Sequence, residues 1–412
     1  MAAGRYDCGM RFALLLAAAG ALAAQGLQFD FTSGKPAPGF RQVPPGTLYS
    51  EETGYGFEDA ATRPPFYFSV RVPEEGNYRV TVTLGDPAAD SVTTIKAELR
   101  RLMLERVRVA AGVVETRTFL VNVRTPKIPG DGAVRLKDRE RTFEARAWDD
   151  RLTLEFTDAH PAVRTVTVEK ADRVPTIYIV GDSTCADQPR EPFNSWGQML
   201  TRFFKPEIAV ANHAESGESL RGFLAENRWA KVLSAMQPGD FVLIQMGHND
   251  QKEKGEGIGP FTSYKSSLKR MIADARAHGA TPLLITSMNR LTFDADGRIS
   301  NSLGDYPEAA RQAAQEESVA LIDLNLMSKA FYEALGPRDA HLAFAGDDHT
   351  HHDDYGSYEL AKCIVEGIRA AGVPLAKYLV EMPRFDPAHP DPPAGFDIPA
   401  EPAAEAPRPY GQ

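Results

Sequence analysis

After Pro175 the chain carries five short, almost wholly apolar runs, and segments with helical spacing separate them. Strands that are buried on both faces have this composition, and their alternation with helices is typical of a parallel sheet covered by helices. In one intervening segment Leu268, Met271 and Ala275 fall on a single helical face. The pattern therefore predicts an α/β domain over residues 173–380, with functional groups gathered where the strands end. The predicted strands are residues 176–180, 208–211, 241–246, 283–286 and 320–324.

Residues 26–172 have a different pattern, because apolar and polar residues alternate there in short runs. Half-buried strands require this alternation, and turn residues such as those at 73–77 separate the runs. We therefore expect an antiparallel β-sandwich domain before the α/β domain. Residues 95–109 have mixed periodicity, so helix and strand both remain open there. The clearest strands are residues 66–72, 78–84, 117–123, 151–156 and 163–168.

Residues 1–24 have the layout of a secretory signal peptide. Arg5 and Arg11 supply positive charge, and residues 12–22 form a short apolar segment. Small residues follow, with Ala21 and Ala23 or Leu22 and Ala24 at the possible cleavage positions. The apolar segment is too short to span a bilayer comfortably, so a cleaved signal is favoured over a membrane anchor. We expect a mature protein that is secreted or periplasmic and has no membrane contact.

Charge and cysteine content limit the partners and covalent links of the chain. The formal net charge of -10 argues against nucleic-acid binding, which needs a basic face. One of the 3 cysteines lies in the predicted signal, and Cys185 and Cys363 could form one disulfide in an oxidising compartment. In the Pro-rich tail at residues 381–412, we expect Phe385 and Phe396 to pack back on the domain and the last residues to be disordered. The oligomeric state stays open.

Polar motifs follow three of the predicted strands. The first strand ends in the motif at residues 181–184, where Ser183 can project its hydroxyl into an open site near a helix N-terminus. The second leads to a loop with Gly217, which lets a backbone N–H approach a ligand closely. The third ends at residues 247–250, where the side chain of Asn249 can donate to a developing oxyanion. Taken singly, each motif is also typical of an ordinary turn.

A fourth motif, D-H-T-H, precedes a helical stretch at residues 355–371. The spacing of Asp348 and His351 allows a hydrogen bond across one turn, which would leave the other ring nitrogen free to accept a proton from Ser183. The surrounding block is dense in potential metal ligands, so a divalent metal site is the alternative. The block comprises His349, His351 and His352 with Asp347, Asp348, Asp353 and Asp354.

The four motifs, in this order, resemble the sequence blocks of the SGNH (GDSL-like) hydrolases over residues 175–380. The stretches N-H-A-E-S-G-E-S-L-R, G-H-N-D-Q-K and D-H-T-H-H-D-D-Y-G are similar in particular to the rhamnogalacturonan acetylesterase branch, whose members often carry a β-sandwich before the catalytic domain. The resemblance implies a flavodoxin-like three-layer α/β/α hydrolase domain. The preceding sandwich would be galactose-binding-like or carbohydrate-binding-like.

The resemblance also implies a role for each motif. Ser183 would attack an ester carbonyl, His351 would take and return the proton, and Asp348 would orient the imidazole. The oxyanion would be held by the N–H groups of Ser183 and Gly217 and by the side chain of Asn249. No metal or organic cofactor is needed for this chemistry.

The implied substrate is an O-acetyl ester on a pectic polysaccharide, rhamnogalacturonan, which carries uronate carboxylates. Basic groups in the predicted site loops could meet such a carboxylate, although each of them could also be a solvated surface charge. For His248, a structural role is the alternative. The candidates for substrate binding are Arg221, Arg290 and His248, and Arg228, Lys252 and Lys254 stand nearby.

Three alternatives stay open at this stage. The esterase could act on another acetylated polysaccharide such as xylan. The chain could be a carbohydrate-binding protein with an inactive hydrolase domain, or a metal-dependent hydrolase centred on the His/Asp block. Aromatic side chains of the predicted sandwich could line a sugar site or belong to its core; these are Tyr55, Phe57, Tyr67 and Trp148.

Overall fold

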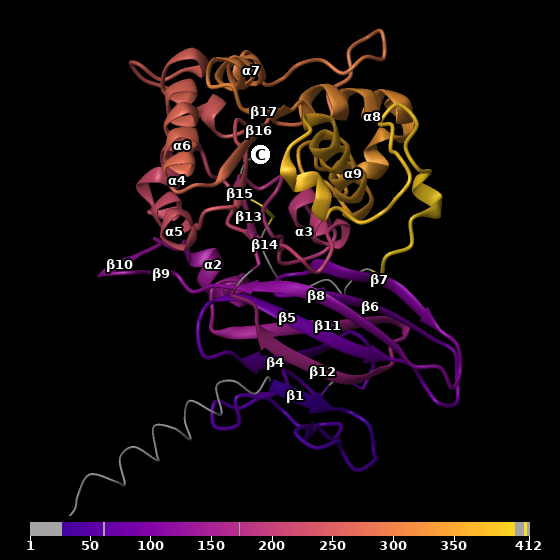
Figure 1. Ribbon diagram of the computed structural model, residues 1–412. Coiled ribbons are helices and arrows are strands. Elements are labelled where there is room, and N and C mark those ends of the chain that lie inside the picture. Colours follow the sequence, from indigo (N-terminus) through magenta and orange to yellow (C-terminus); the bar gives the residue numbers. More distant parts are fainter. Residues whose placement is uncertain (1–26, 61, 173, 400–407, 410–412) are drawn as a thin grey trace, which may run out of the picture.

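The computed structural model describes residues 27–60, 62–172, 174–399 and 408–409. The predicted signal peptide and the disorder predicted for the last residues lie outside these ranges. Figure 1 shows two stacked parts, which we call the N-terminal region (described residues up to 172) and the C-terminal region (from Val174). No helix in the described ranges has the length and apolar character needed to cross a membrane.

The N-terminal region consists of two five-stranded sheets, ordered β2-β1-β12-β5-β8 and β3-β4-β11-β6-β7. All neighbouring strands in them are antiparallel except β1 and β2. Val80 and Val121 of the first sheet share one apolar core with Phe68 and Leu154 of the second. The first sheet contains β1 (Leu27–Asp30), β2 (Arg41–Gln42), β5 (Gly76–Leu84), β8 (Glu115–Val123) and β12 (Val163–Lys170). The second contains β3 (Tyr55–Phe57), β4 (Phe66–Arg71), β6 (Ser91–Ala97), β7 (Arg101–Val109) and β11 (Arg151–His160).

All five runs predicted as strands in this region are strands, so the alternating pattern is confirmed there. Short elements outside the two five-stranded sheets include the hairpin of β9 (Lys127–Ile128) and β10 (Gly132–Ala133) and the helix α2 (Asp138–Phe143). In Figure 1, α2 lies at the junction with the C-terminal region. This position brings it close to the candidate site described below.

The stretch left open between helix and strand is the hairpin formed by β6 and β7. Its tight turn contains two residues in the left-handed region, Glu98 (φ 55°) and Arg100 (φ 62°). The tip packs against the C-terminal region: Arg101 donates to Asp187 at 2.7 Å, and Arg100 donates to the carbonyl of Phe193 at 2.7 Å. Because charged residues occupy buried positions here, the apolar alternation that identifies a half-buried strand is lost.

The C-terminal region is built on a parallel sheet with the order β14-β13-β15-β16-β17. In chain order this is 2-1-3-4-5, the flavodoxin-like arrangement, in which the strand order reverses at β13. Each of the five apolar runs is a strand, which confirms the predicted α/β fold with a parallel sheet. The strands are β13 (Thr176–Gly181), β14 (Ala209–Asn212), β15 (Phe241–Gln245), β16 (Thr281–Ile285) and β17 (Ala320–Ile322).

Helices cover both faces of this sheet, and each face has its own apolar core. On one face, α3, α8 and α9 contribute Trp196, Phe331 and Leu360 to the core. On the other face, α4 and α6 contribute Phe223 and Leu268. The result is three layers, helix on sheet on helix (Figure 1). The helices are α3 (Trp196–Leu200), α4 (Leu220–Ala225), α5 (Arg228–Ala235), α6 (Lys265–Ala277), α7 (Tyr306–Glu316), α8 (Leu324–Asp339) and α9 (Asp354–Ala371).

Two further expectations concern the tail and the cysteines. Phe385 and Phe396 do pack against the core that contains α9, and the ring of Phe396 lies 5.6 Å from that of Tyr358. Cys185 and Cys363 are buried free thiols, and the structure contains no disulfide between them.

Candidate active site

The first and fourth sequence motifs meet at the carboxyl end of β13. The Oγ atom of Ser183 lies 2.8 Å from Nε2 of His351, and Nδ1 of His351 donates to Asp348 at 2.9 Å. The second carboxylate oxygen of Asp348 accepts backbone N–H groups of Thr350 (2.7 Å) and His351 (2.9 Å). The structure thus brings all three residues of the predicted triad into one hydrogen-bonded chain.

The environment of Asp348 favours its charged form. Burial acts to raise the pKa of this carboxyl, but the bonds and charge of His351 and the two backbone N–H groups outweigh it and lower the pKa. An ionised Asp348 holds the imidazole proton on Nδ1. Nε2 is then left to accept the hydroxyl proton of Ser183, as nucleophilic catalysis requires.

Two amide side chains that the sequence analysis missed hold the loop after Ser183. Gln188 is buried, and its side chain donates to the carbonyl of Ser183 (2.7 Å) and to Oγ of Ser216 (3.4 Å). Asn212, at the end of β14, donates to the carbonyl of Cys185 at 2.7 Å. Asn212 stands at a predicted strand end, which was a usable sign of function. Gln188 carries no such sign, because its role comes from a tertiary contact.

The three predicted oxyanion donors lie in neighbouring loops. Gly217 has a φ of 80°, a conformation that glycine adopts without steric cost. The side chain of Asn249 donates to the carbonyl of Glu218 at 2.9 Å and so ties the loop after β15 to the loop after β14. In the described part of the chain, neither the N–H of Ser183 nor that of Gly217 donates to a protein acceptor. Both are therefore available to a developing oxyanion.

Arg290 lies beside the triad. Its Nε donates to the hydroxyl of Thr350 at 3.2 Å, and its Nη2 donates to the carbonyl of His248 at 3.3 Å. Burial lowers the pKa of Arg290, and burial together with the charge of Arg290 lowers the pKa of the exposed Lys252. The two cations are thus close to each other at the site. Arg221 is exposed on α4.

Two of the basic candidates are placed differently from the expectation. His248 is buried, with Nδ1 3.0 Å from a carboxylate oxygen of Asp182 and Nε2 3.0 Å from the carbonyl of Met288. Both ring nitrogens are therefore occupied, and His248 holds the motif of Ser183 rather than a substrate. Arg228 is fully buried and donates two bonds to Glu140, at 3.0 and 2.6 Å. It therefore cannot meet a uronate at the surface.

The side chains of the His/Asp block do not converge as metal ligands. His349 is exposed and its Nδ1 lies 3.0 Å from the carbonyl of Leu291, whereas Nε2 of His352 lies 2.6 Å from the hydroxyl of Tyr332. Burial, and next the neighbouring His351, lower the pKa of His352 to about 3. Of the three histidines in the block, only His351 contacts Ser183, whereas His349 and His352 contact other parts of the chain.

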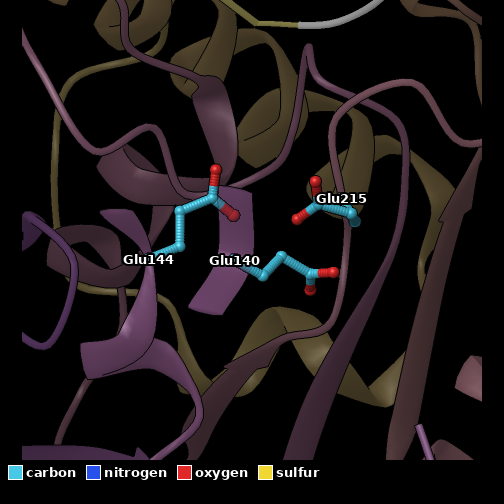
Figure 2. A group of neighbouring side chains, drawn as sticks. All are labelled: Glu140, Glu144 and Glu215. Atoms are coloured by element: carbon cyan, nitrogen blue, oxygen red, sulfur yellow. The ribbon is translucent and has the colours of Figure 1, made fainter. Parts of the chain in front are cut away.

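Among the described residues, a different group has ligand atoms close enough to hold a metal: the buried carboxyls of Glu140, Glu144 and Glu215 (Figure 2). Cations of the protein already face them. Arg228 donates to Glu140 as described above, and Arg139 donates to Glu144 at 2.6 Å. The group is therefore an internal ion-pair network, and it lies next to the loop of Gly217.

Comparison with known proteins agrees with this geometry. Residues 179–358 match the GDSL-like lipase/acylhydrolase family. The rhamnogalacturonan acetylesterase RhgT of Bacillus subtilis is 36% identical over 219 residues, which are 50% of this chain and 94% of RhgT. The uncharacterized esterase YxiM of the same organism is 29% identical over 384 residues, 84% of this chain and 91% of YxiM. The crystal structure of YxiM superposes with a TM-score of 0.48 at 26% identity and covers 85% of this chain and 99% of that chain.

The family match and the similarity to RhgT confirm the resemblance that the four motifs indicated. RhgT exceeds 30% identity over nearly its whole length, and the family match includes the motifs of Ser183, Gly217, Asn249 and His351. The chain belongs to the GDSL-like lipase/acylhydrolase family, and it is a carboxylic ester hydrolase.

Proposed function

We propose that the protein is a serine esterase that removes O-acetyl groups from a pectic polysaccharide, rhamnogalacturonan, through an acyl-enzyme. The observation that carries the proposal is the hydrogen-bonded chain from Ser183 through His351 to Asp348, placed beside two uncommitted backbone N–H groups. The substrate class is supported by the name of RhgT and by the basic pair Arg290 and Lys252 beside the triad, which suits a uronate.

The proposed reaction has two halves. Oγ of Ser183 attacks the acetyl carbonyl as its proton passes to Nε2 of His351, and the N–H groups of Ser183 and Gly217 with the amide of Asn249 stabilise the resulting oxyanion. The C–O bond to the sugar breaks, and His351 returns the proton to the leaving alcohol. A water molecule, deprotonated by His351, then attacks the acetyl-Ser183 ester and releases acetate.

The test is acetate release by the wild type and by Ser183→Ala. Substrates are acetylated rhamnogalacturonan, acetylated xylan and p-nitrophenyl esters of increasing acyl length. We expect release selective for rhamnogalacturonan, and a loss of at least about 10³-fold in the variant. Preference for xylan or for long acyl chains would keep the mechanism and overturn the substrate. Undiminished activity in a folded Ser183→Ala variant would overturn the mechanism.

We further propose that the N-terminal region is a β-sandwich domain and that the chain is exported. The shared core of the two sheets supports the first, and the charged and apolar segments before residue 25 support the second. Export is tested by sequencing the N-terminus of the protein recovered from culture supernatant and periplasm. Recovery of the intact N-terminus from the cytoplasm alone would contradict export.

A further inference from the structure

A lysine of the N-terminal region contacts the loop that holds Gly217. Lys137 stands directly before α2, and its ammonium group donates to the carbonyl of Ser216 at 2.5 Å. The same ammonium group pairs with the carboxylate of Glu218, which is buried. One side chain therefore binds the loop on both sides of Gly217.

The contacted carbonyl belongs to the same peptide unit as the N–H of Gly217. A cation at the oxygen of a peptide draws electron density toward that oxygen and makes the N–H a stronger donor. It also fixes the plane of the peptide, and with it the direction of the N–H. Donors of an oxyanion hole are effective because they are oriented before the charge develops. Lys137 therefore influences the orientation and the donor strength of the Gly217 N–H, which are the properties that an oxyanion hole requires.

The network around Glu140 in turn fixes Lys137. The backbone N–H of Lys137 donates to the carboxylate of Glu140 at 2.7 Å, and the same carboxylate accepts two bonds from the buried Arg228. Arg228 begins α5 of the C-terminal region, so the start of α2 is anchored across the junction. Because the backbone of Lys137 is already fixed, its contact with Ser216 costs only the rotational entropy of the lysine side chain.

The carboxyl groups of this network are buried. Arg139 pairs with Glu144, Arg228 with Glu140 and Glu218, and Lys137 with Glu218. Burial, and then the charges of Glu144 and Glu140, raise the pKa of Glu215 well above its usual range, which favours its protonated form. In Figure 2 the carboxyl of Glu215 points toward those of Glu140 and Glu144.

We propose that Lys137 is a positioning residue of the esterase: by holding the carbonyl of Ser216, it orients and polarises the peptide whose N–H, that of Gly217, is a donor of the oxyanion hole. The inference rests on the proposed serine mechanism and adds a task for the N-terminal region. That region then supports catalysis through a direct contact with the site loop, whether or not it also binds sugar.

The experiment compares Lys137→Met with Lys127→Met on p-nitrophenyl acetate and on acetylated rhamnogalacturonan. Lys127 is an exposed lysine of the same region. Its backbone pairs with Ala133 and accepts a bond from Lys231, and none of the contacts among the described residues involves its side chain. For Lys137→Met we expect kcat to fall about 10- to 100-fold, less than the loss of a whole oxyanion donor, with KM nearly unchanged. Lys137→Arg should recover a large part of kcat, and Lys127→Met should match the wild type.

A merely structural role predicts a different outcome. If kcat of Lys137→Met, measured per folded enzyme molecule, stays within about twofold of the wild type, the inference is wrong. Should the single variant not fold, Lys137→Met with Glu218→Gln removes the buried charge along with its partner, and the same fall in kcat is expected. Ser183→Ala, measured alongside, separates the two proposals: if it stays active, the serine mechanism fails first.

Discussion

The buried carboxylate of Asp348 accepts hydrogen bonds from two backbone N–H groups and from the ring of His351. A buried carboxylate is stable only with such compensation. The two backbone bonds come from the residues that follow Asp348 in the D-x-x-H motif. The D-x-x-H motif therefore stabilises the charge of Asp348 by local contacts. Of the triad, only Ser183 comes from a distant part of the chain.

We predict that Asp348→Asn lowers kcat by about 10⁴-fold, because an amide in place of the carboxylate allows the wrong imidazole tautomer. Steady-state kinetics on p-nitrophenyl acetate measure the loss, and circular dichroism checks that the variant is folded. A folded variant that raises KM and keeps kcat would contradict the orienting role of Asp348.

Residues inside short motifs could be predicted from the sequence, because their partners are near in sequence or lie at strand ends. Ser183, Asn249 and His351 are of this kind. Gln188 could not be predicted, since its bonds to the Ser183 and Ser216 loops arise only when the chain has folded. Arg228 shows the opposite error: an arginine near a site loop in sequence is turned inward by its carboxylate partners.

At the scale of elements, every buried apolar run and every alternating run singled out in the sequence is a strand. The short strands β1, β2 and β3 were not predicted. The hairpin of β6 and β7 stayed open between helix and strand, because its tip carries charged residues into the junction between the two regions. Hydrophobic periodicity assumes that buried positions are apolar. Where buried positions carry charged residues that are satisfied by ion pairs and backbone carbonyls, the sequence no longer alternates between apolar and polar residues.

Glu98 at this tip should make stability depend on pH. Burial raises its pKa to about 8, whereas the unfolded chain releases this proton near 4.5. The native state therefore binds more protons between these values, and its free energy of unfolding falls as pH rises, by at most about 1.4 kcal/mol per pH unit from this group. We predict that Glu98→Gln, which keeps an acceptor for the N–H of Thr153, weakens this fall.

Urea unfolding of the wild type and of Glu98→Gln at pH 5, 6.5 and 8 measures the effect. From pH 5 to 6.5 and from pH 6.5 to 8, the free energy of unfolding should fall more for the wild type than for Glu98→Gln. Parallel pH dependences for the two proteins would show that Glu98 titrates at its ordinary pKa.

At the scale of the whole molecule, the two regions are joined by buried polar contacts. Arg101 pairs with Asp187, Gln198 donates to the carbonyl of Leu99 at 2.8 Å, and Thr201 donates to the carbonyl of Leu102 at 2.6 Å. The sequence predicted the main strands of both regions but not this junction, because polar residues at an internal junction look like surface residues in a sequence. We expect the two regions to unfold together.

We predict that Arg101→Met and Asp187→Asn each lower the free energy of unfolding by about 3–5 kcal/mol, because each leaves a buried charge without its ion-pair partner. The double variant should cost less than the sum, with a coupling of about 0.5–3 kcal/mol. Denaturant unfolding of the wild type, the two single variants and the double variant supplies the four free energies of this double-mutant cycle. Strictly additive costs would contradict a direct Arg101–Asp187 interaction, and two separate calorimetric transitions in the wild type would contradict cooperative unfolding.

The Arg101–Asp187 pair also restricts how such proteins can be recombined. Asp187 belongs to the loop after Ser183, and its partner guanidinium is encoded more than 80 positions earlier, in the hairpin of the other region. A chimaera that exchanges the first region for an unrelated module would leave the carboxylate of Asp187, close to the nucleophile, without its guanidinium partner. We therefore expect such an exchange to need a matching substitution at position 187.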